Sequence, residues 1–166
     1  MTLALACAHW QAQAAELGVQ IELPALQVAE YHRPYLSLWL EGADQKVVGQ
    51  LALWYDVKKR EGAGQKWLKD MRTWWRKAGR DLSKPADSYS GATRGAGTHK
   101  LTFSGAQQPL AELPAGRYVL AAEVAREGGG REVVRVGFDW PAKGADPVTI
   151  GQGQEELGRI EVRVKP

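Results

Sequence analysis

One short segment gathers the side chains of this sequence that are best suited to chemistry. It reads Asp87-Ser88-Tyr89-Ser90-Gly91-Ala92-Thr93-Arg94. Ser90 and Thr93 carry hydroxyl groups, and Gly91 and Ala92 leave the backbone between them accessible. The Ser90 hydroxyl can shape a turn by local hydrogen bonding, and the planar guanidinium of Arg94 suits bidentate contact with a phosphate. The segment is either a modification or ligand site, or a plain turn that leads into a strand at residues 98–104.

A second candidate region is rich in tryptophan and positive charge. Trp67, Met71, Trp74 and Trp75 recur at helical spacings, which predicts an inserted amphipathic helix at about residues 65–78 that ends at Gly79. The rest of this helix is basic and carries Lys66, Lys69, Arg72, Arg76 and Lys77. The indoles either pack on the fold or line a pocket for an aromatic ring. The basic face is either a solvated surface or a site for a phosphate or an acidic partner.

Other chemical motifs are weak in this sequence. His32 and His99 are far apart and have no cysteine or histidine at metal-ligand spacing, so we expect no metal site. His99 follows Thr93 by six residues and could lie near a ligand bound there. The sequence contains no nucleophile elbow and no glycine-rich phosphate loop before a helix, which disfavours hydrolase function.

Alternating apolar residues predict the elements that must position these groups. Residues 35–40 and 47–54 alternate on either side of the turn residues 41–44, which predicts a hairpin. Residues 117–126 and 133–140 flank the glycine run 128–130 and predict a second one. Further alternation opens the chain at residues 19–23 and closes it at 160–164. About seven strands with these turn spacings predict an all-β, immunoglobulin-like β-sandwich.

Composition and the N-terminus indicate an exported single domain. The chain has 166 residues, 44% hydrophobic and 25% charged, which is a globular balance. Residues 1–14 combine an uncharged apolar run with the small triplet Ala12-Gln13-Ala14, as in a signal-peptide remnant; the alternative is a short N-terminal helix of the mature protein. Removal of the remnant leaves residues 15–166 as one domain. No later stretch reaches the roughly 20 apolar residues of a membrane span. We therefore expect a soluble periplasmic protein.

The charge gives no indication of nucleic-acid binding, and the cysteine content gives no disulfide within the domain. A net charge of +3 and a pI near 9.0 are too mild to indicate nucleic-acid binding. Cys7 is the only cysteine and lies in the apolar N-terminal run, so the domain contains no disulfide.

The segment that ends at Thr93 has the form D-x-x-S-G-A-T, which resembles the target motif of bacterial FAD:protein FMN transferases. In such targets the last Thr or Ser is esterified to the FMN phosphate, so the resemblance implies that Thr93 is the acceptor. A hydroxyl that attacks a pyrophosphate must be accessible, and Gly91 and Ala92 provide that access. Asp87 either caps the turn or contacts the metal of the transferase. Trp74, Trp75 and Arg94 are then candidates to contact the ring and the phosphate.

The wider chain resembles a bacterial family of predicted periplasmic proteins of unknown function. The resemblance rests on the stretches 34–39, 51–54, 67–76, 90–94, 97–99 and 114–118. Members of such families occur beside PepSY-type membrane proteins and flavin transferases in iron-uptake settings. The resemblance implies a periplasmic electron-transfer role, with ferric chelates as acceptors.

Two functions are expected from these observations. The first is a periplasmic flavoprotein that carries covalent FMN on Thr93 and transfers electrons with a PepSY-type partner; it is an electron carrier or accessory protein rather than a stand-alone enzyme. The second is a cofactor-free immunoglobulin-like module that binds a membrane or outer-membrane partner through the basic helix. Modification of Thr93 distinguishes the two.

Overall fold

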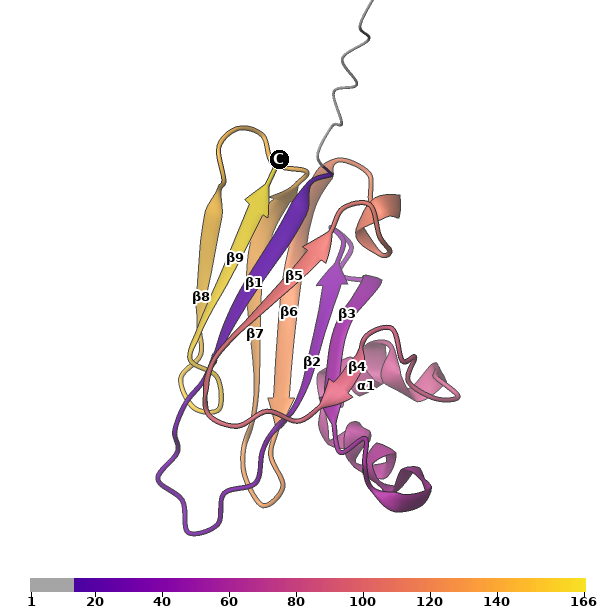
Figure 1. The fold of residues 1–166 in the computed structure, drawn as a ribbon, viewed down its shortest axis with the longest axis vertical. Coiled ribbons are helices and arrows are strands. Elements are labelled where there is room, and N and C mark those ends of the chain that lie inside the picture. Colours follow the sequence, from indigo (N-terminus) through magenta and orange to yellow (C-terminus); the bar gives the residue numbers. More distant parts are fainter. Residues whose placement is uncertain (1–13) are drawn as a thin grey trace, which may run out of the picture.

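The alternation of apolar residues is realised as two mainly antiparallel β-sheets in the computed structural model, which describes residues 14–166 (Figure 1). Within these residues the strands are β1 (Glu16–Leu23), β2 (Tyr35–Glu41), β3 (Val47–Tyr55), β4 (Ser90–Ala92), β5 (Gly97–Ser104), β6 (Gly116–Ala125), β7 (Arg131–Trp140), β8 (Val148–Gln152) and β9 (Arg159–Lys165). One sheet has the order β5-β1-β9-β8, and the other has the order β4-β3-β2-β6-β7. The only parallel pair among these strands joins β3 and β4.

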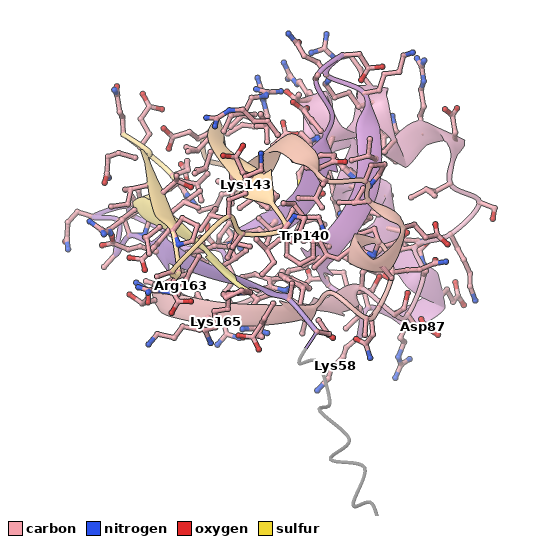
Figure 2. The ribbon with its side chains drawn as sticks, turned by 90° about the horizontal axis from the view of Figure 1, so that it is seen from above. Lys58, Asp87, Trp140, Lys143, Arg163 and Lys165 are labelled. Atoms are coloured by element: carbon pink, nitrogen blue, oxygen red, sulfur yellow. The ribbon has the colours of Figure 1, made fainter. Side chains whose placement is uncertain are left out.

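The main core lies between the two sheets. Leu36, Leu38 and Leu40 of β2 face the four-stranded sheet and are fully buried, together with Val19 and Ile21 of β1. Seen from above, Trp140 lies in the middle of the molecule while charged side chains extend outward around it (Figure 2). The structure therefore confirms the predicted all-β sandwich; its immunoglobulin-like character stays a prediction.

A helical insertion between β3 and β4 covers the outer face of the five-stranded sheet (Figure 1). It consists of the 3₁₀ helix η1 (Arg60–Asp70), the helix α1 (Arg72–Lys77) and the 3₁₀ turn η2 (Gly79–Asp81); a further 3₁₀ turn, η3 (Leu110–Glu112), precedes β6. Leu68, Met71 and Trp74 of the insertion are buried against Trp39 and Leu53 of the sheet in a second apolar cluster. As a result every residue of β2 is buried, because both of its faces are covered.

The insertion differs from the single predicted helix over residues 65–78. Its backbone leaves helical geometry at Met71 (φ −77°, ψ 75°), which separates η1 from α1. Two strands are also present that the alternation did not predict: β4, inside the stretch expected to be irregular, and β8. The predicted signal-peptide remnant lies almost wholly in residues 1–13, outside the described residues, so the boundary at residue 15 stays a prediction.

Candidate functional site

The predicted modification segment lies at the edge of the five-stranded sheet. Ser90, Gly91 and Ala92 form β4, which pairs with Leu53–Tyr55 at the end of β3. The backbone N–H of Leu53 donates a hydrogen bond to the Tyr89 carbonyl at 2.8 Å. Strand pairing therefore holds the segment in place, and half-buried Thr93 follows directly after the edge strand. A short edge strand, rather than an irregular loop, presents the threonine.

Packing does not require a small residue at every position of β4. A Cβ atom added at Gly91 would meet the Trp54 ring at 3.6 Å, an ordinary van der Waals contact, and Ala92 is exposed. The Ser90 hydroxyl is buried and has no hydrogen-bond partner within the described residues. Asp87 is exposed in the turn before β4, and its carboxylate makes no hydrogen bond within residues 14–166, so no Asx interaction forms there.

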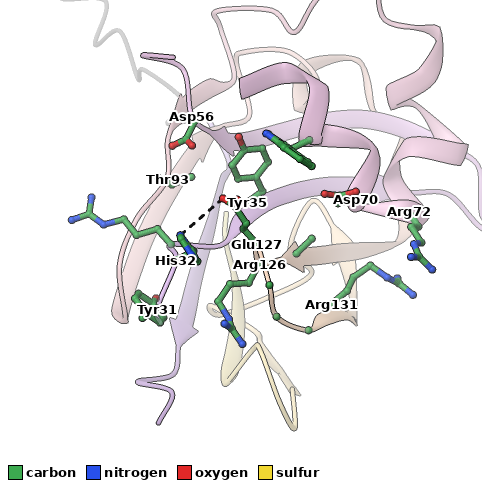
Figure 3. Close-up of a pocket in the computed structure, with 16 residues that line it drawn as sticks. Tyr31, His32, Tyr35, Asp56, Asp70, Arg72, Thr93, Arg126, Glu127 and Arg131 are labelled. Atoms are coloured by element: carbon green, nitrogen blue, oxygen red, sulfur yellow. Dashed lines mark ion pairs between the residues drawn. The ribbon is translucent and has the colours of Figure 1, made fainter. Parts of the chain in front are cut away.

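A pocket of about 750 Å³ opens beside Thr93. Its walls come from four parts of the chain: the segment before β2, the insertion, the residue after β4, and the hairpin between β6 and β7. Aromatic side chains are contributed by Tyr31, Tyr35 and Trp67, and guanidinium groups by Arg33, Arg72, Arg126 and Arg131. Figure 3 shows Thr93 near Tyr35 and Asp56, with Arg72 and Arg131 at the opposite end of the pocket.

Two of the four arginines are fixed by carboxylates. Arg126 makes a bidentate contact with Glu156 at 2.9 and 3.0 Å, and this contact raises the pKa of the guanidinium. Arg131 contacts the fully buried Glu123 at 2.9 Å. Within residues 14–166, Arg33 and Arg72 form no ion pair, so their charges are available to an anion. Asp56, Asp70 and Glu127 also line the pocket, and Glu127 lies 4.0 Å from His32 (Figure 3).

Tyr35 forms part of the pocket wall as a neutral phenol. Burial raises its pKa to about 12, and its hydroxyl donates a hydrogen bond to the Gly64 carbonyl at 3.0 Å. Its ring meets the ring of Tyr55 edge-on, with centroids 6.4 Å apart. The hydrogen bond connects β2 to η1, so it holds the insertion against the end of the sheet where Thr93 lies.

A buried carboxylate on β6 holds helix α1 of the insertion against the sheet. Glu123 accepts hydrogen bonds from the backbone N–H groups of Thr73 at 3.0 Å and Trp74 at 2.6 Å. These are free N–H groups in the first turn of α1, which a carboxylate satisfies well. The same carboxylate binds Arg131, so it links α1 to a pocket residue on β7. Arg72, at the start of α1, is thereby held at the pocket.

Arg94 occupies a separate aromatic cluster. Its guanidinium stacks over the Trp54 ring at 4.2 Å from the centroid, and the His99 ring meets Trp54 edge-on at 5.6 Å. The His99 Nε2 atom lies 2.8 Å from the Gly95 carbonyl oxygen. Neither Arg94 nor His99 is among the residues that line the Thr93 pocket. The structure thus places Arg94 next to Thr93 in the chain but directs its side chain onto Trp54.

The predicted ring-contacting tryptophans are also apart from this pocket. Trp74 is fully buried, and its indole N–H donates to the Gln50 side-chain oxygen at 2.8 Å. Half-buried Trp75 packs beside it and lines a smaller cavity of about 250 Å³. Of the three tryptophans in the predicted helix, Trp67 is the one that lines the Thr93 pocket. Sequence reasoning missed Tyr31, Tyr35 and the arginines of the β6–β7 hairpin, for which the only signal was the predicted hairpin tip at 128–130.

Fold and site together define a two-sheet β-sandwich protein with a helical insertion and an arginine-lined pocket at one end of a sheet. The chain belongs to the DUF2271 family, described as predicted periplasmic proteins, whose sequence profile matches residues 16–159. The family and the periplasmic location expected from the sequence are thus shown. Neither curated proteins nor solved structures show a match to this chain. None of the helices in residues 14–166 is long and apolar enough to cross a membrane, and this part of the chain has no metal-binding group of three His, Cys, Asp or Glu side chains.

Proposed function

We propose that this protein is a periplasmic electron-transfer flavoprotein that carries FMN covalently on Thr93. The observation that carries the proposal is that Thr93 follows an edge strand and lines a pocket that also holds aromatic and guanidinium side chains. The pocket volume of about 750 Å³ falls in the ordinary range for small-molecule sites, roughly 300–1,000 Å³.

The residues of the pocket fit the chemical parts of FMN. Tyr31 and Trp67 are exposed enough to contact a planar ring, and Tyr35 supplies an aromatic wall. Arg72 has no ion pair within residues 14–166, and it lies across the pocket from Thr93 beside Arg131 (Figure 3). Guanidinium groups there favour negative charge at that end of the pocket. When bound, FMN supplies one- and two-electron transfer, while the chain tethers it and sets its surroundings.

The attachment chemistry requires an accessible hydroxyl. The Thr93 oxygen attacks the FMN phosphorus of FAD, so a new P–O ester bond forms while the pyrophosphate bond breaks and AMP leaves with the bonding electrons. The hydroxyl proton passes to a base of the transferase. Packing permits a side chain at Gly91, so the glycine serves access to Thr93 rather than the fold.

The proposal extends to partners by the family resemblance. An FAD:protein FMN transferase attaches the group, a PepSY-type membrane protein donates electrons, and ferric chelates accept them. The alternative function, a cofactor-free binding module, is favoured by one observation, the exposed basic side chains of the insertion.

Flavin fluorescence of the denatured protein tests the proposal. The chain is exported together with an FAD:protein FMN transferase and separated on a denaturing gel, which removes any non-covalent flavin. We expect a fluorescent band for the wild type and for Thr98→Ala, and none for Thr93→Ala. Thr98 is the matched control because it is an exposed threonine of β5 close in sequence. A dark wild-type band beside a fluorescent control substrate would leave the binding module as the function.

A further inference from the structure

The charge of the protein is concentrated in the insertion. Residues 57–84 contain ten lysines and arginines and three acidic residues, a net charge of +7. The rest of the chain contains twelve basic and sixteen acidic residues, a net charge of −4. Residues 1–13 contain no charged side chain, so the same imbalance holds for the described part. The mild total of +3 therefore conceals two regions of opposite sign.

Most positive side chains of the insertion face away from the sandwich; Lys77 is an exception, because it pairs with the buried Glu41 of β2. Leu68, Met71 and Trp74 turn inward to the sheet, which leaves most of the basic residues on the outer side. Three of the ten form ion pairs, namely Lys59 with Asp56, Lys77 with Glu41 and Arg80 with Asp81. Within residues 14–166 the other seven form none; they are Lys58, Arg60, Lys66, Lys69, Arg72, Arg76 and Lys84, and all are exposed. We name the outer side of residues 57–84 the basic surface.

Large apolar side chains are exposed on the same segment. Val57, Trp67 and Leu82 have exposed fractions of 40%, 37% and 38%. The Lys66 ammonium lies 5.0 Å from the Trp67 ring centroid, and Lys66, Leu82 and Lys84 border one small cavity. An indole and aliphatic side chains interleaved with lysines are typical of surfaces that lie on a bilayer, where the rings sit at headgroup level and the ammonium groups meet lipid phosphates.

We infer that the basic surface binds the anionic headgroups of a phospholipid membrane. A bilayer requires dispersed cations and a few apolar side chains but no matching groove, and the cavity on this surface is only about 250 Å³. An acidic protein partner would instead have to match the shape of this surface closely at the centre of the contact. Because Trp67 and Arg72 belong both to the insertion and to the Thr93 pocket, docking would bring that pocket to the membrane. The inference does not depend on modification of Thr93.

Vesicle co-sedimentation of the full mature chain tests this inference. We expect binding to vesicles of equal parts phosphatidylglycerol and phosphatidylcholine, weakening at high salt, and no binding to phosphatidylcholine alone. The triple variant Lys66→Glu, Lys69→Glu and Lys84→Glu should bind about a hundredfold or more weakly, since each of the three lost cations contributes about 1 kcal/mol near a charged bilayer. Thr93→Ala should bind as the wild type does, which separates this test from that of the proposed function.

The control is a triple variant with the same charge change elsewhere, Lys100→Glu, Arg117→Glu and Lys143→Glu. These positions lie outside the insertion and are exposed; Figure 2 shows Lys143 well separated from Lys58 of the basic surface. Unchanged vesicle binding by the control variant supports binding through the basic surface. An equal loss of binding in both variants would overturn the inference, because it would show that only the net charge of the protein matters. Failure of the wild type to bind anionic vesicles while it is retained on immobilised polyglutamate would assign the surface to an acidic protein instead. If a variant does not fold, the salt dependence of wild-type binding to the anionic vesicles decides whether the protein binds anionic headgroups.

Discussion

At the scale of single residues, the site depends on the position of Thr93 in the fold, because its hydroxyl is an ordinary one. It follows a three-residue edge strand, and its half-buried side chain lines a pocket whose other walls come from distant parts of the chain. The neighbouring Gly91 has room for a side chain. Because packing does not require glycine there, substitution separates the needs of the fold from the needs of the modification.

Gly91→Ala should keep the fold but reduce FMN attachment. The added Cβ makes only an ordinary contact with Trp54, and an alanine in a strand lowers the entropy of the unfolded chain relative to glycine, so stability should change by less than about 1 kcal/mol. The methyl group narrows the approach to Thr93. Urea unfolding measures the first effect, and the modified fraction by mass spectrometry measures the second. Full modification of the variant would contradict the role given to this glycine.

Glu132 should make the folded protein less stable at acid pH. Burial by itself raises the pKa of its carboxyl, but hydrogen bonds from the backbone N–H groups of residues 154–157 outweigh this, so the pKa lies below its usual value. Because the pKa of Glu132 is lower in the folded protein than in the unfolded chain, its ionised carboxylate stabilises the fold. This stabilisation is complete above the pKa of the unfolded chain, near 4.5, and is lost as the pH falls through the pKa of the folded protein.

The comparison of wild type with Glu132→Gln checks this sign. We expect the variant to lose about 1–3 kcal/mol of unfolding free energy at neutral pH, and the difference to shrink as the pH falls below 4.5. Glu155→Gln, an exposed neighbour, is the control. A difference that stays constant between neutral and acid pH would show that the charge of Glu132 plays no part.

At the scale of elements, the attachment of the insertion to the sheet decides the shape of the pocket. Glu123 binds the first turn of α1 and Arg131, Tyr35 binds the Gly64 carbonyl, and Glu41 binds Lys77 near the end of α1. The Glu41 carboxyl is buried, which raises its pKa, but hydrogen bonds from Arg135, Trp39 and Lys77 lower the pKa further than burial raises it. Charged anchors at both ends thus fix α1 on the outer face of β2 and β6.

Glu123→Gln should loosen α1 specifically. The amide retains one acceptor but leaves the guanidinium of Arg131 without its anionic partner, so we expect a loss of about 2 kcal/mol in unfolding free energy. Hydrogen exchange at the amides of Thr73 and Trp74 should accelerate. Glu61→Gln, an exposed position in η1, provides the control. Unchanged exchange at these two amides would mean that Glu123 does not hold the helix.

Much of this architecture could be predicted at the element scale, where the signal is local. Strands such as β2, β6 and β7 have clear alternation, and the glycine run at 128–130 marks the turn between β6 and β7. The break at Met71 could not be predicted, because α1 starts where Glu123, fifty residues away from Thr73, accepts its N–H groups. Strand β4 escaped prediction because Ser-Gly-Ala has no apolar alternation and is a strand only through its pairing with β3.

The candidate site was predictable only in part for the same reason. The hydroxyl motif is visible in the sequence, but its surroundings are not: Tyr31, Trp67 and Arg131 meet at the pocket because the sheets and insertion fold together. Helical spacing alone could not separate the buried Trp74 from the pocket-lining Trp67. Adjacency in the chain likewise suggested Arg94, whose side chain stacks on Trp54.

At the scale of the whole molecule, the insertion links the two proposals. Its inner side completes the second apolar cluster, one edge supplies Trp67 and Arg72 to the Thr93 pocket, and its outer side forms the basic surface. A sandwich alone would leave Thr93 on an open sheet edge; the insertion gives it a pocket. A membrane-docked orientation would then bring a flavin on Thr93 close to a membrane-embedded electron donor.

Mass spectrometry of the mature protein, exported with an active FAD:protein FMN transferase, shows whether Thr93 carries FMN. We expect an intact mass higher by one FMN less one water, and digestion should locate this addition on the peptide that contains Thr93. An unmodified mass, with the transferase active on a control substrate in the same cells, would contradict it and reduce the Asp87–Thr93 segment to the edge of a sheet.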